Sequence, residues 1–199
     1  KLEEMMEWCQ ELGIRVLTVY AFSTENLDRP KEELETLMDI FADAFRQVGD
    51  DPRIHGSRVR VCAIGHRELL PERVREAIAY AEEKTAHYDD YRYNIAVAYG
   101  GRQEIIQAIR QLAHKVQVGE LEPDEIDTEM VSKHLYTGDL PDPDLILRTS
   151  GEERVSNFLL WQLAYSEFYF ADVYWPALRK VDFLRAIRAY QQRRRRRGL

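Results

Sequence analysis

Two arginines and a serine follow a short apolar run in the last third of the chain. Arg148 comes directly after residues 145–147, and Arg154 and Ser156 follow six and eight positions later. A guanidinium group binds phosphate or carboxylate through paired hydrogen bonds. A helix that begins near Ser156 would add its backbone N–H groups and the positive end of its dipole. The spacing therefore predicts an anion site at the end of a buried strand.

The same residues also allow a purely structural interpretation. Arg148 and Arg154 could pair with Glu152 and Glu153 at the surface, and Ser156 could then serve only as a helix cap. The two arginines alone leave both interpretations open. A second polar segment elsewhere in the chain is needed to favour one of them.

Such a segment follows the apolar run at residues 15–21. It combines hydroxyl, carboxylate, amide and guanidinium groups at Ser23, Thr24, Glu25, Asn26 and Arg29. These side chains offer a second anion contact and an amide that could orient a proton. The alternative is a turn and cap ahead of Pro30, which suits the first turn of a helix. Two polar segments of this kind favour one shared site.

Glu167 heads a further apolar run at residues 167–173. A carboxylate that enters such a strand usually has a partner, either an arginine or a divalent cation. Hard oxygen ligands beside phosphate favour Mg²⁺ over transition metals. The sequence leaves both kinds of partner open for Glu167.

The apolar pattern alternates between two kinds of segment. Short runs rich in β-branched and aromatic residues predict strands at residues 15–21, 58–64, 93–99, 144–149 and 167–173. Apolar spacings of three and four predict helices at about 30–48, 71–85, 105–116, 156–165 and 181–196. This alternation predicts an α/β fold, a single domain with a mainly parallel central sheet flanked by helices. Ligands of such folds bind beyond the carboxyl ends of the strands, where the polar loops would meet.

Composition limits the class of protein. With 199 residues, 45% of them hydrophobic, the chain suits one domain with a sizeable core. It holds no run of about 18 apolar residues and no signal-peptide pattern. Two cysteines, Cys9 and Cys62, are too few for a disulfide framework, so we expect a reducing, cytoplasmic compartment. A net charge of −7 argues against a nucleic-acid partner, although five arginines stand at residues 193–197.

Several catalytic and nucleotide-binding motifs are missing from the sequence. It contains no G-x-S-x-G, no G-x-x-x-x-G-K-[ST] and no G-x-G-x-x-G, and none of its five histidines pairs at metal-ligand spacing. Gly100 and Gly101 follow a predicted strand. We expect this pair to let a helix pack closely rather than to hold a phosphate group.

Long stretches of the chain resemble the cis-prenyltransferase family, the undecaprenyl diphosphate synthases and their relatives. They read "YAFSTENLDRP" (20–30), "NIAVAYGGRQEI" (94–105), "DLILRTSGEERVSNFLLWQLAYSEFYF" (144–170), "VYWP" (173–176) and Arg-Arg-Gly (196–198). They span essentially the whole chain in the family's order, and the stretch at 144–170 is highly specific. The segment "GDLPDPDLILRTSGEERVSNFLLWQ" is most similar to the archaeal branch.

The resemblance implies a role for each polar residue. The diphosphate of isopentenyl diphosphate would be bound by Arg148, Arg154, Val155 and Ser156. Further substrate-binding positions would be Ser23, Thr24, Glu25, Leu27 and Arg29. Asn26 matches the residue that assists proton removal, and Glu167 matches a carboxylate associated with Mg²⁺. The family works as homodimers, in which Arg196 and Gly198 would reach the neighbouring active site.

The implied activity is repeated condensation of isopentenyl diphosphate onto an allylic diphosphate primer, farnesyl or geranylgeranyl diphosphate. The product would be a long-chain polyprenyl diphosphate, a precursor of glycosyl carriers, so transient membrane contact is expected. The fold would enclose an apolar tunnel, for which the apolar faces of residues 34–48 and 74–82, with alternate residues of the strands, are candidates. The sequence leaves open that the same residues form ordinary core. One alternative is a non-catalytic partner subunit of the same family. Another is a binder of nucleic acid or acidic membranes through residues 193–197.

Two features depart from the family's pattern. An entry strand that ends in an Asp-Gly-Asn-Gly-Arg loop, with the principal magnesium aspartate, should precede Lys1 and is absent. We therefore expect the numbered chain to be the retained part of a longer protein. Leu27 occupies a position that is often aromatic, which puts a stacking contact with the allylic substrate in doubt.

Overall fold

The computed structural model describes residues 1–193, which form seven α-helices and five strands. The helices are α1 (Leu2–Glu11), α2 (Lys31–Asp50), α3 (Pro52–Gly56), α4 (Glu72–Thr85), α5 (Gly101–Gln117), α6 (Thr128–Lys133) and α7 (Lys180–Gln192). The strands are β1 (Val16–Ser23), β2 (Val59–Ile64), β3 (Tyr91–Tyr99), β4 (Leu145–Arg148) and β5 (Glu167–Phe170). The five predicted strands are confirmed.

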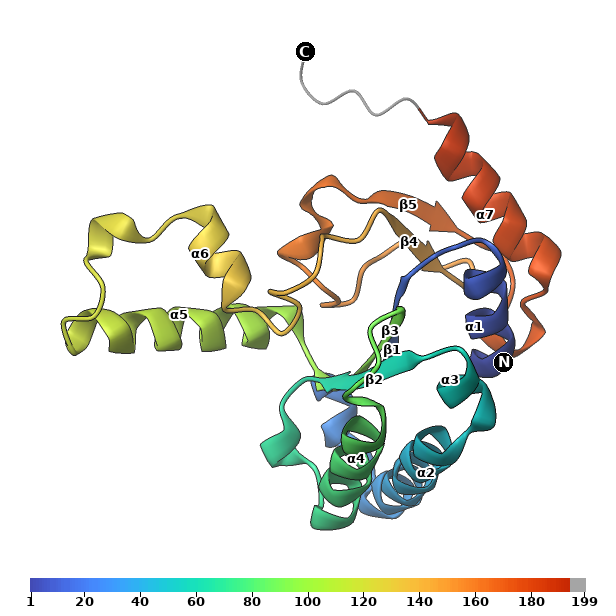
Figure 1. The fold of residues 1–199 in the computed structure, drawn as a ribbon, viewed down its shortest axis with the longest axis horizontal. Coiled ribbons are helices and arrows are strands. Elements are labelled where there is room, and N and C mark those ends of the chain that lie inside the picture. The colour runs from blue at the N-terminus through green and yellow to red at the C-terminus, as the bar shows by residue number, and fades with distance from the viewer. Residues whose placement is uncertain (194–199) are drawn as a thin grey trace.

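All strand pairs in the described chain are parallel. One sheet has the order β1-β3-β2, and β4 pairs with β5 in a second sheet (Figure 1). The predicted α/β domain with a parallel sheet flanked by helices is therefore confirmed, and the strands divide into two sheets. Because parallel strands end at the same edge, the loops after β1 and β3 leave their sheet side by side.

Helices α2 and α4 cover one face of the three-stranded sheet (Figure 1). The apolar stripes predicted for these helices supply the buried side chains of this layer, among them Met38, Phe45, Val74 and Ile78. Alternate residues of a strand point to opposite faces, so Ala96 faces the other way, toward a cluster with Leu159 and Leu163. The predicted apolar tunnel beside α2 and α4 stays a prediction.

Apolar side chains also bridge the two sheets. Leu17 of β1 and Leu147 of β4 both pack against a cluster formed by α1 and α7, which contains Trp8 and Phe183. Helix α5 projects away from the sheets with α6 beside it (Figure 1). No helix within residues 1–193 is long and apolar enough to cross a membrane.

The end of α7 differs from the sequence prediction. The helix was expected to continue to about residue 196, but it ends at Gln192, and the backbone of Arg193 is extended. Arg193 donates from its side chain to Glu167 and to the carbonyl oxygen of Phe168. Arg196 and Gly198 lie outside the described residues.

Side chains close the outer edge of β2. The backbone N–H of Val61 donates to Thr85 Oγ1 at 3.1 Å, and that of Ala63 donates to Glu82 Oε1 at 2.9 Å. The carbonyl oxygen of Ala63 accepts from Arg67 Nη2 at 2.6 Å, and Arg67 also pairs with Glu82. These contacts satisfy backbone groups that a neighbouring strand would otherwise need to bind.

Replacing Thr85 with valine tests this edge. Thr85 is fully buried and donates to the carbonyl of Ala81, so Thr85→Val keeps the shape and leaves the N–H of Val61 without a partner. We expect a loss of about 1–3 kcal/mol in the free energy of unfolding, measured by urea denaturation. Thr36, an exposed threonine that also bonds the carbonyl four residues back, is the matched control. Thr36→Val should change stability by less than about 0.5 kcal/mol, and equal losses in both variants would contradict the edge assignment.

Candidate functional site

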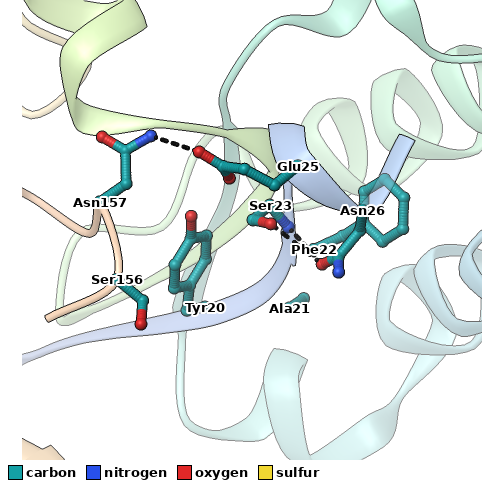
Figure 2. Close-up of a pocket in the computed structure, with 8 residues that line it drawn as sticks. All are labelled: Tyr20, Ala21, Phe22, Ser23, Glu25, Asn26, Ser156 and Asn157. Carbon is teal, nitrogen blue, oxygen red and sulfur yellow. Dashed lines mark hydrogen bonds between the residues drawn. The ribbon is translucent and has the colours of Figure 1, made fainter. Parts of the chain in front are cut away.

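A pocket of about 410 Å³ lies where the end of β1 meets the segment that follows β4 (Figure 2). Its lining consists of Tyr20, Ala21, Phe22, Ser23, Glu25, Asn26, Ser156 and Asn157. The two polar strand ends that the sequence singled out therefore meet in one cavity. The start of α5, which follows β3, is bonded to Asn157 of the same lining.

The 3₁₀ turn at Thr24–Asp28 fixes the orientation of Asn26. Its Oδ1 accepts hydrogen bonds from the backbone N–H of Ser23 at 3.0 Å and from the Ser23 hydroxyl at 3.1 Å. Because a backbone N–H can only donate, the amide oxygen of Asn26 must face Ser23. The amide nitrogen then faces away from Ser23 (Figure 2). Asn26 is thus placed to donate a hydrogen bond, and its oxygen is already occupied.

Glu25 is the ionised group of the pocket. Its Oε1 accepts from Asn157 Nδ2 at 2.8 Å, and its Oε2 accepts from the Thr24 hydroxyl at 3.3 Å. Burial acts to raise the pKa of Glu25. Hydrogen bonds from its own backbone N–H, Asn157, Ser23 and Thr24 outweigh burial and lower the pKa. The carboxylate therefore carries its negative charge at neutral pH.

Leu27 and Arg29 are outside the pocket lining. Leu27 packs against the core cluster beneath α2, so its apolar side chain turns inward. Arg29 pairs with Glu33, one turn along α2, and both side chains are almost half exposed. An exposed ion pair of this kind contributes little stability, so Arg29 can exchange Glu33 for another anion.

Arg148 and Ser156 are brought together at the end of β4. Arg148 Nη1 donates to Ser156 Oγ at 2.9 Å and to the carbonyl oxygen of Arg154. No carboxylate within residues 1–193 forms an ion pair with Arg148, whereas Arg154 pairs with Glu152 at the surface. The structural interpretation of the sequence therefore applies to Arg154 alone. Val155 packs on the cluster under the pocket and contributes its backbone to the turn.

The helix predicted for residues 156–165 does not form. Ser156, Asn157 and Leu159 have positive φ angles of 48°, 61° and 43°, and only a short 3₁₀ turn, Gln162–Tyr165, follows. The apolar spacing of this segment serves burial against the sheet and not a helix, because Leu159 and Leu163 lie in the cluster around Tyr99. The backbone N–H groups of residues 155–157 therefore lack the alignment of a helix N-terminus.

Asn157 instead caps the N-terminus of α5. Its carbonyl oxygen accepts from the N–H of Gly101 at 2.6 Å, and its Oδ1 accepts from the N–H of Arg102 at 2.9 Å. A Cβ atom at Gly101 would lie 2.8 Å from Leu160 Cγ and 2.9 Å from Leu160 N, so only glycine allows this approach. The expectation that Gly100 and Gly101 permit close packing is confirmed for Gly101.

A buried carboxylate on α5 also holds the segment that follows β4. Glu104, 2% exposed, accepts from the Tyr99 hydroxyl at 2.5 Å and from the backbone N–H of Tyr136 at 2.8 Å. Gln162 Nε2 lies 3.2 and 3.3 Å from the two carboxylate oxygens. Burial, followed by the negative charge of Glu104, raises the pKa of Tyr99, so this phenol stays protonated and donates.

Glu167 lies at the opposite end of its sheet from Arg148. It pairs with Leu145 at the start of β4, whereas Arg148 pairs with Phe170, so about 10 Å of strand separates the two ends. Glu167 Oε2 is 2.6 Å from Arg193 Nη1, so the partner of Glu167 within one chain is an arginine. No group of three or more His, Cys, Asp or Glu within residues 1–193 could hold a metal ion.

Sequence reasoning missed Tyr20 and Asn157. Tyr20 stacks on Phe158 with ring centroids 4.7 Å apart, and its hydroxyl donates to the carbonyl oxygen of Tyr99 at 3.0 Å. Burial, with the nearby charge of Glu25, raises the pKa of Tyr20 to about 12. The available signal for Asn157 was its residue type, because asparagine tolerates positive φ better than most residues do.

Known proteins resemble this chain over almost its whole length. The model of the undecaprenyl diphosphate synthase family matches residues 1–198. Two archaeal relatives are each named tritrans,polycis-undecaprenyl-diphosphate synthase (geranylgeranyl-diphosphate specific). The protein from Methanocaldococcus jannaschii is 58% identical over 200 residues, and that from Methanopyrus kandleri is 60% identical over 198 residues. All of this chain is covered in both cases, and it spans 71% and 73% of their lengths.

Solved structures share the fold. Lavandulyl diphosphate synthase from Lavandula x intermedia, solved in complex with dimethylallyl diphosphate, superposes with a TM-score of 0.92 at 38% identity, covering 97% of this chain and 83% of that one. A probable undecaprenyl diphosphate synthase from Campylobacter jejuni gives a TM-score of 0.86 at 37% identity, covering 100% and 90%. The chain therefore belongs to the undecaprenyl diphosphate synthase family, and it is a transferase of cis-prenyl diphosphate synthesis.

Proposed function

We propose that this protein condenses isopentenyl diphosphate repeatedly onto geranylgeranyl diphosphate and releases a long-chain polyprenyl diphosphate that serves as a glycosyl-carrier precursor. The observation that carries the proposal is the pocket in which Asn26 and Ser156 face one cavity beside Arg148. The names of the archaeal relatives support geranylgeranyl diphosphate as the primer, in preference to farnesyl diphosphate. The same names disfavour the alternative of a non-catalytic partner subunit.

The proposed diphosphate contacts follow from the donors left free. The Ser156 hydroxyl accepts a hydrogen bond from Arg148, so its own proton is available to a diphosphate oxygen. Arg148 keeps further N–H groups for the same anion, and Asn26 Nδ2 offers a donor from the opposite wall. Donors fixed before the substrate arrives stabilise the charge that develops as the primer's diphosphate departs.

The proposed reaction breaks the bond between the allylic carbon and its diphosphate oxygen, and the electron pair leaves with diphosphate. The double bond of isopentenyl diphosphate attacks that carbon, and a proton then leaves the isopentenyl unit. The Asn26 oxygen is bonded to Ser23 and cannot accept this proton. Its amide N–H instead orients a diphosphate oxygen, which accepts it. The products are a prenyl diphosphate whose hydrocarbon chain is longer by one isoprene unit, and free diphosphate.

Further parts of the proposal concern assembly. A homodimer is supported by α5, which projects from the body and leaves Ile106 and Ile109 about half exposed. Within such a dimer, Arg196 and Gly198 would act at the neighbouring site. A lipid product implies transient contact with a membrane.

Mg²⁺ is proposed as the cofactor with Glu167 as its carboxylate, and no step above depends on that ion.

The primer preference tests the proposed function. Assays with radiolabelled isopentenyl diphosphate should give a kcat/KM about tenfold or more higher with geranylgeranyl than with farnesyl diphosphate, because the two primers differ by a whole isoprene unit of apolar contact. Chromatography of the products should show chains extended by several units. Equal use of both primers would contradict the primer assignment, and no extension of either would contradict the activity.

Arg148→Ala should weaken the use of isopentenyl diphosphate. Loss of one charge-assisted contact costs about 1.5–3 kcal/mol, which is roughly a tenfold to hundredfold loss in kcat/KM. Arg154→Ala should fall in the same range, because its exposed pair with Glu152 gives way to a diphosphate. Arg185→Ala, which removes an exposed arginine paired with Asp182 on α7, is the matched control and should retain activity. A wild-type kcat/KM in Arg148→Ala or in Arg154→Ala would refute the role of that arginine.

Two neutralising substitutions separate the roles of Glu167. Glu167→Gln and Arg193→Gln both remove the ion pair between these residues, but only Glu167→Gln removes a carboxylate. If Glu167 binds Mg²⁺ in the assembled enzyme, only Glu167→Gln should raise the magnesium concentration required for half-maximal turnover. The same shift in both variants, or none in either, would return Glu167 to the role of ion-pair partner.

A further inference from the structure

We propose that Asn157 is a positioning residue that sets the diphosphate-binding geometry by holding the carboxylate of Glu25 at the rim of the pocket and Ser156 beside Arg148. This inference rests on the proposed function, because it assigns the way in which that site is kept ready. It concerns a residue to which neither the sequence motifs nor the catalytic steps above give a role.

Three polar groups of Asn157 make four hydrogen bonds. Its Nδ2 donates to Glu25 Oε1 at 2.8 Å and to Gln103 Oε1 at 3.0 Å. Its Oδ1 and its backbone carbonyl oxygen accept from the first two N–H groups of α5, at Arg102 and Gly101. Because Arg102 N–H can only donate, the orientation of the amide is fixed. One residue therefore ties the turn after β1 and the start of α5 to the segment after β4.

The backbone at Asn157 explains why this residue can fix Ser156. Both residues have positive φ, at 61° and 48°, a conformation that costs energy for any residue with a side chain and persists only when its surroundings hold it. The four bonds of Asn157 supply that restraint directly next to Ser156. The position of Ser156 Oγ, 2.9 Å from Arg148 Nη1, depends on the same restraint.

The hydrogen bond to Glu25 also has an electrostatic role. Glu25 is an ionised carboxylate in a pocket that we propose for an anion, so its position decides how strongly it repels the diphosphate. Figure 2 shows its carboxylate turned toward Asn157, on the side away from Asn26. The bond thus keeps the negative charge of Glu25 away from the amide donor of Asn26.

Asn157→Asp tests the proposal with minimal change of shape. The new carboxylate keeps an acceptor for the N–H of Arg102 and tolerates positive φ, but it loses the donor and places a negative charge against Glu25. We expect the KM for isopentenyl diphosphate to rise about tenfold or more. The calorimetric Kd for inorganic pyrophosphate should rise by a similar factor, and kcat should change less than about threefold. Gln117→Glu, at the exposed end of α5, is the control for an added charge.

The double variant Asn157→Asp with Glu25→Gln provides the decisive comparison. It reverses donor and acceptor, so the hydrogen bond can form again with one negative charge in place of two. KM and the pyrophosphate Kd should return to within about threefold of the wild-type values. A merely structural role for Asn157 predicts no such recovery, because Glu25→Gln repairs nothing in the backbone at Asn157.

Several outcomes would overturn the inference. An unchanged KM and Kd in Asn157→Asp would do so, as would a double variant no better than the single one. If Asn157→Asp fails to fold, Asn157→Gly keeps the positive φ and removes the same donor. It should then show the same rise in KM, and an unchanged KM there would equally reject the role. A wild-type protein that neither extends a primer nor binds pyrophosphate would instead reject the proposed function.

Discussion

The first two backbone N–H groups of α5 are bonded to Asn157, a residue of the segment that follows β4. Within residues 1–193 the two sheets share no backbone ladder, so contacts of this kind decide how the ends of β1 and β4 stand relative to each other. Glu104, in the first turn of α5, accepts hydrogen bonds from Gln162 of the same segment. The start of α5 thus acts as a fixed point, and the pocket is assembled around it.

The regular elements could be predicted from the sequence because their apolar periods agree with their burial. The stripes on α2 and α4 face the sheet, and all five strand predictions correspond to observed strands. The polar residues after β1 and β4 were also predicted to meet, on the expectation of one shared sheet. They do meet in the pocket, but β1 and β4 lie in different sheets, so the contacts of Asn157 and not a common sheet edge bring them together.

The segment that begins at Ser156 shows where such reasoning stops. Its apolar spacing is compatible with a helix, yet three residues have positive φ because tertiary contacts with Gly101, Arg102 and Tyr99 hold another conformation. Glu167 is a second case. Its sequence context allowed an arginine or a cation, and the arginine found lies beyond the end of the last helix. Neither outcome follows from local pattern, because both depend on residues distant along the chain.

The closed edge of β2 limits how this protein can associate with other chains. A bare edge strand presents free N–H and C=O groups, onto which a foreign strand can add. Here the N–H groups of Val61 and Ala63 and the carbonyl oxygen of Ala63 are already bonded to Thr85, Glu82 and Arg67. A strand arriving at β2 would first have to break those bonds, one of which uses a fully buried hydroxyl. Copies of the protein that meet at high concentration are thereby kept from growing a continuous intermolecular sheet at β2, which protects the folded state from the template-driven aggregation typical of exposed β-edges.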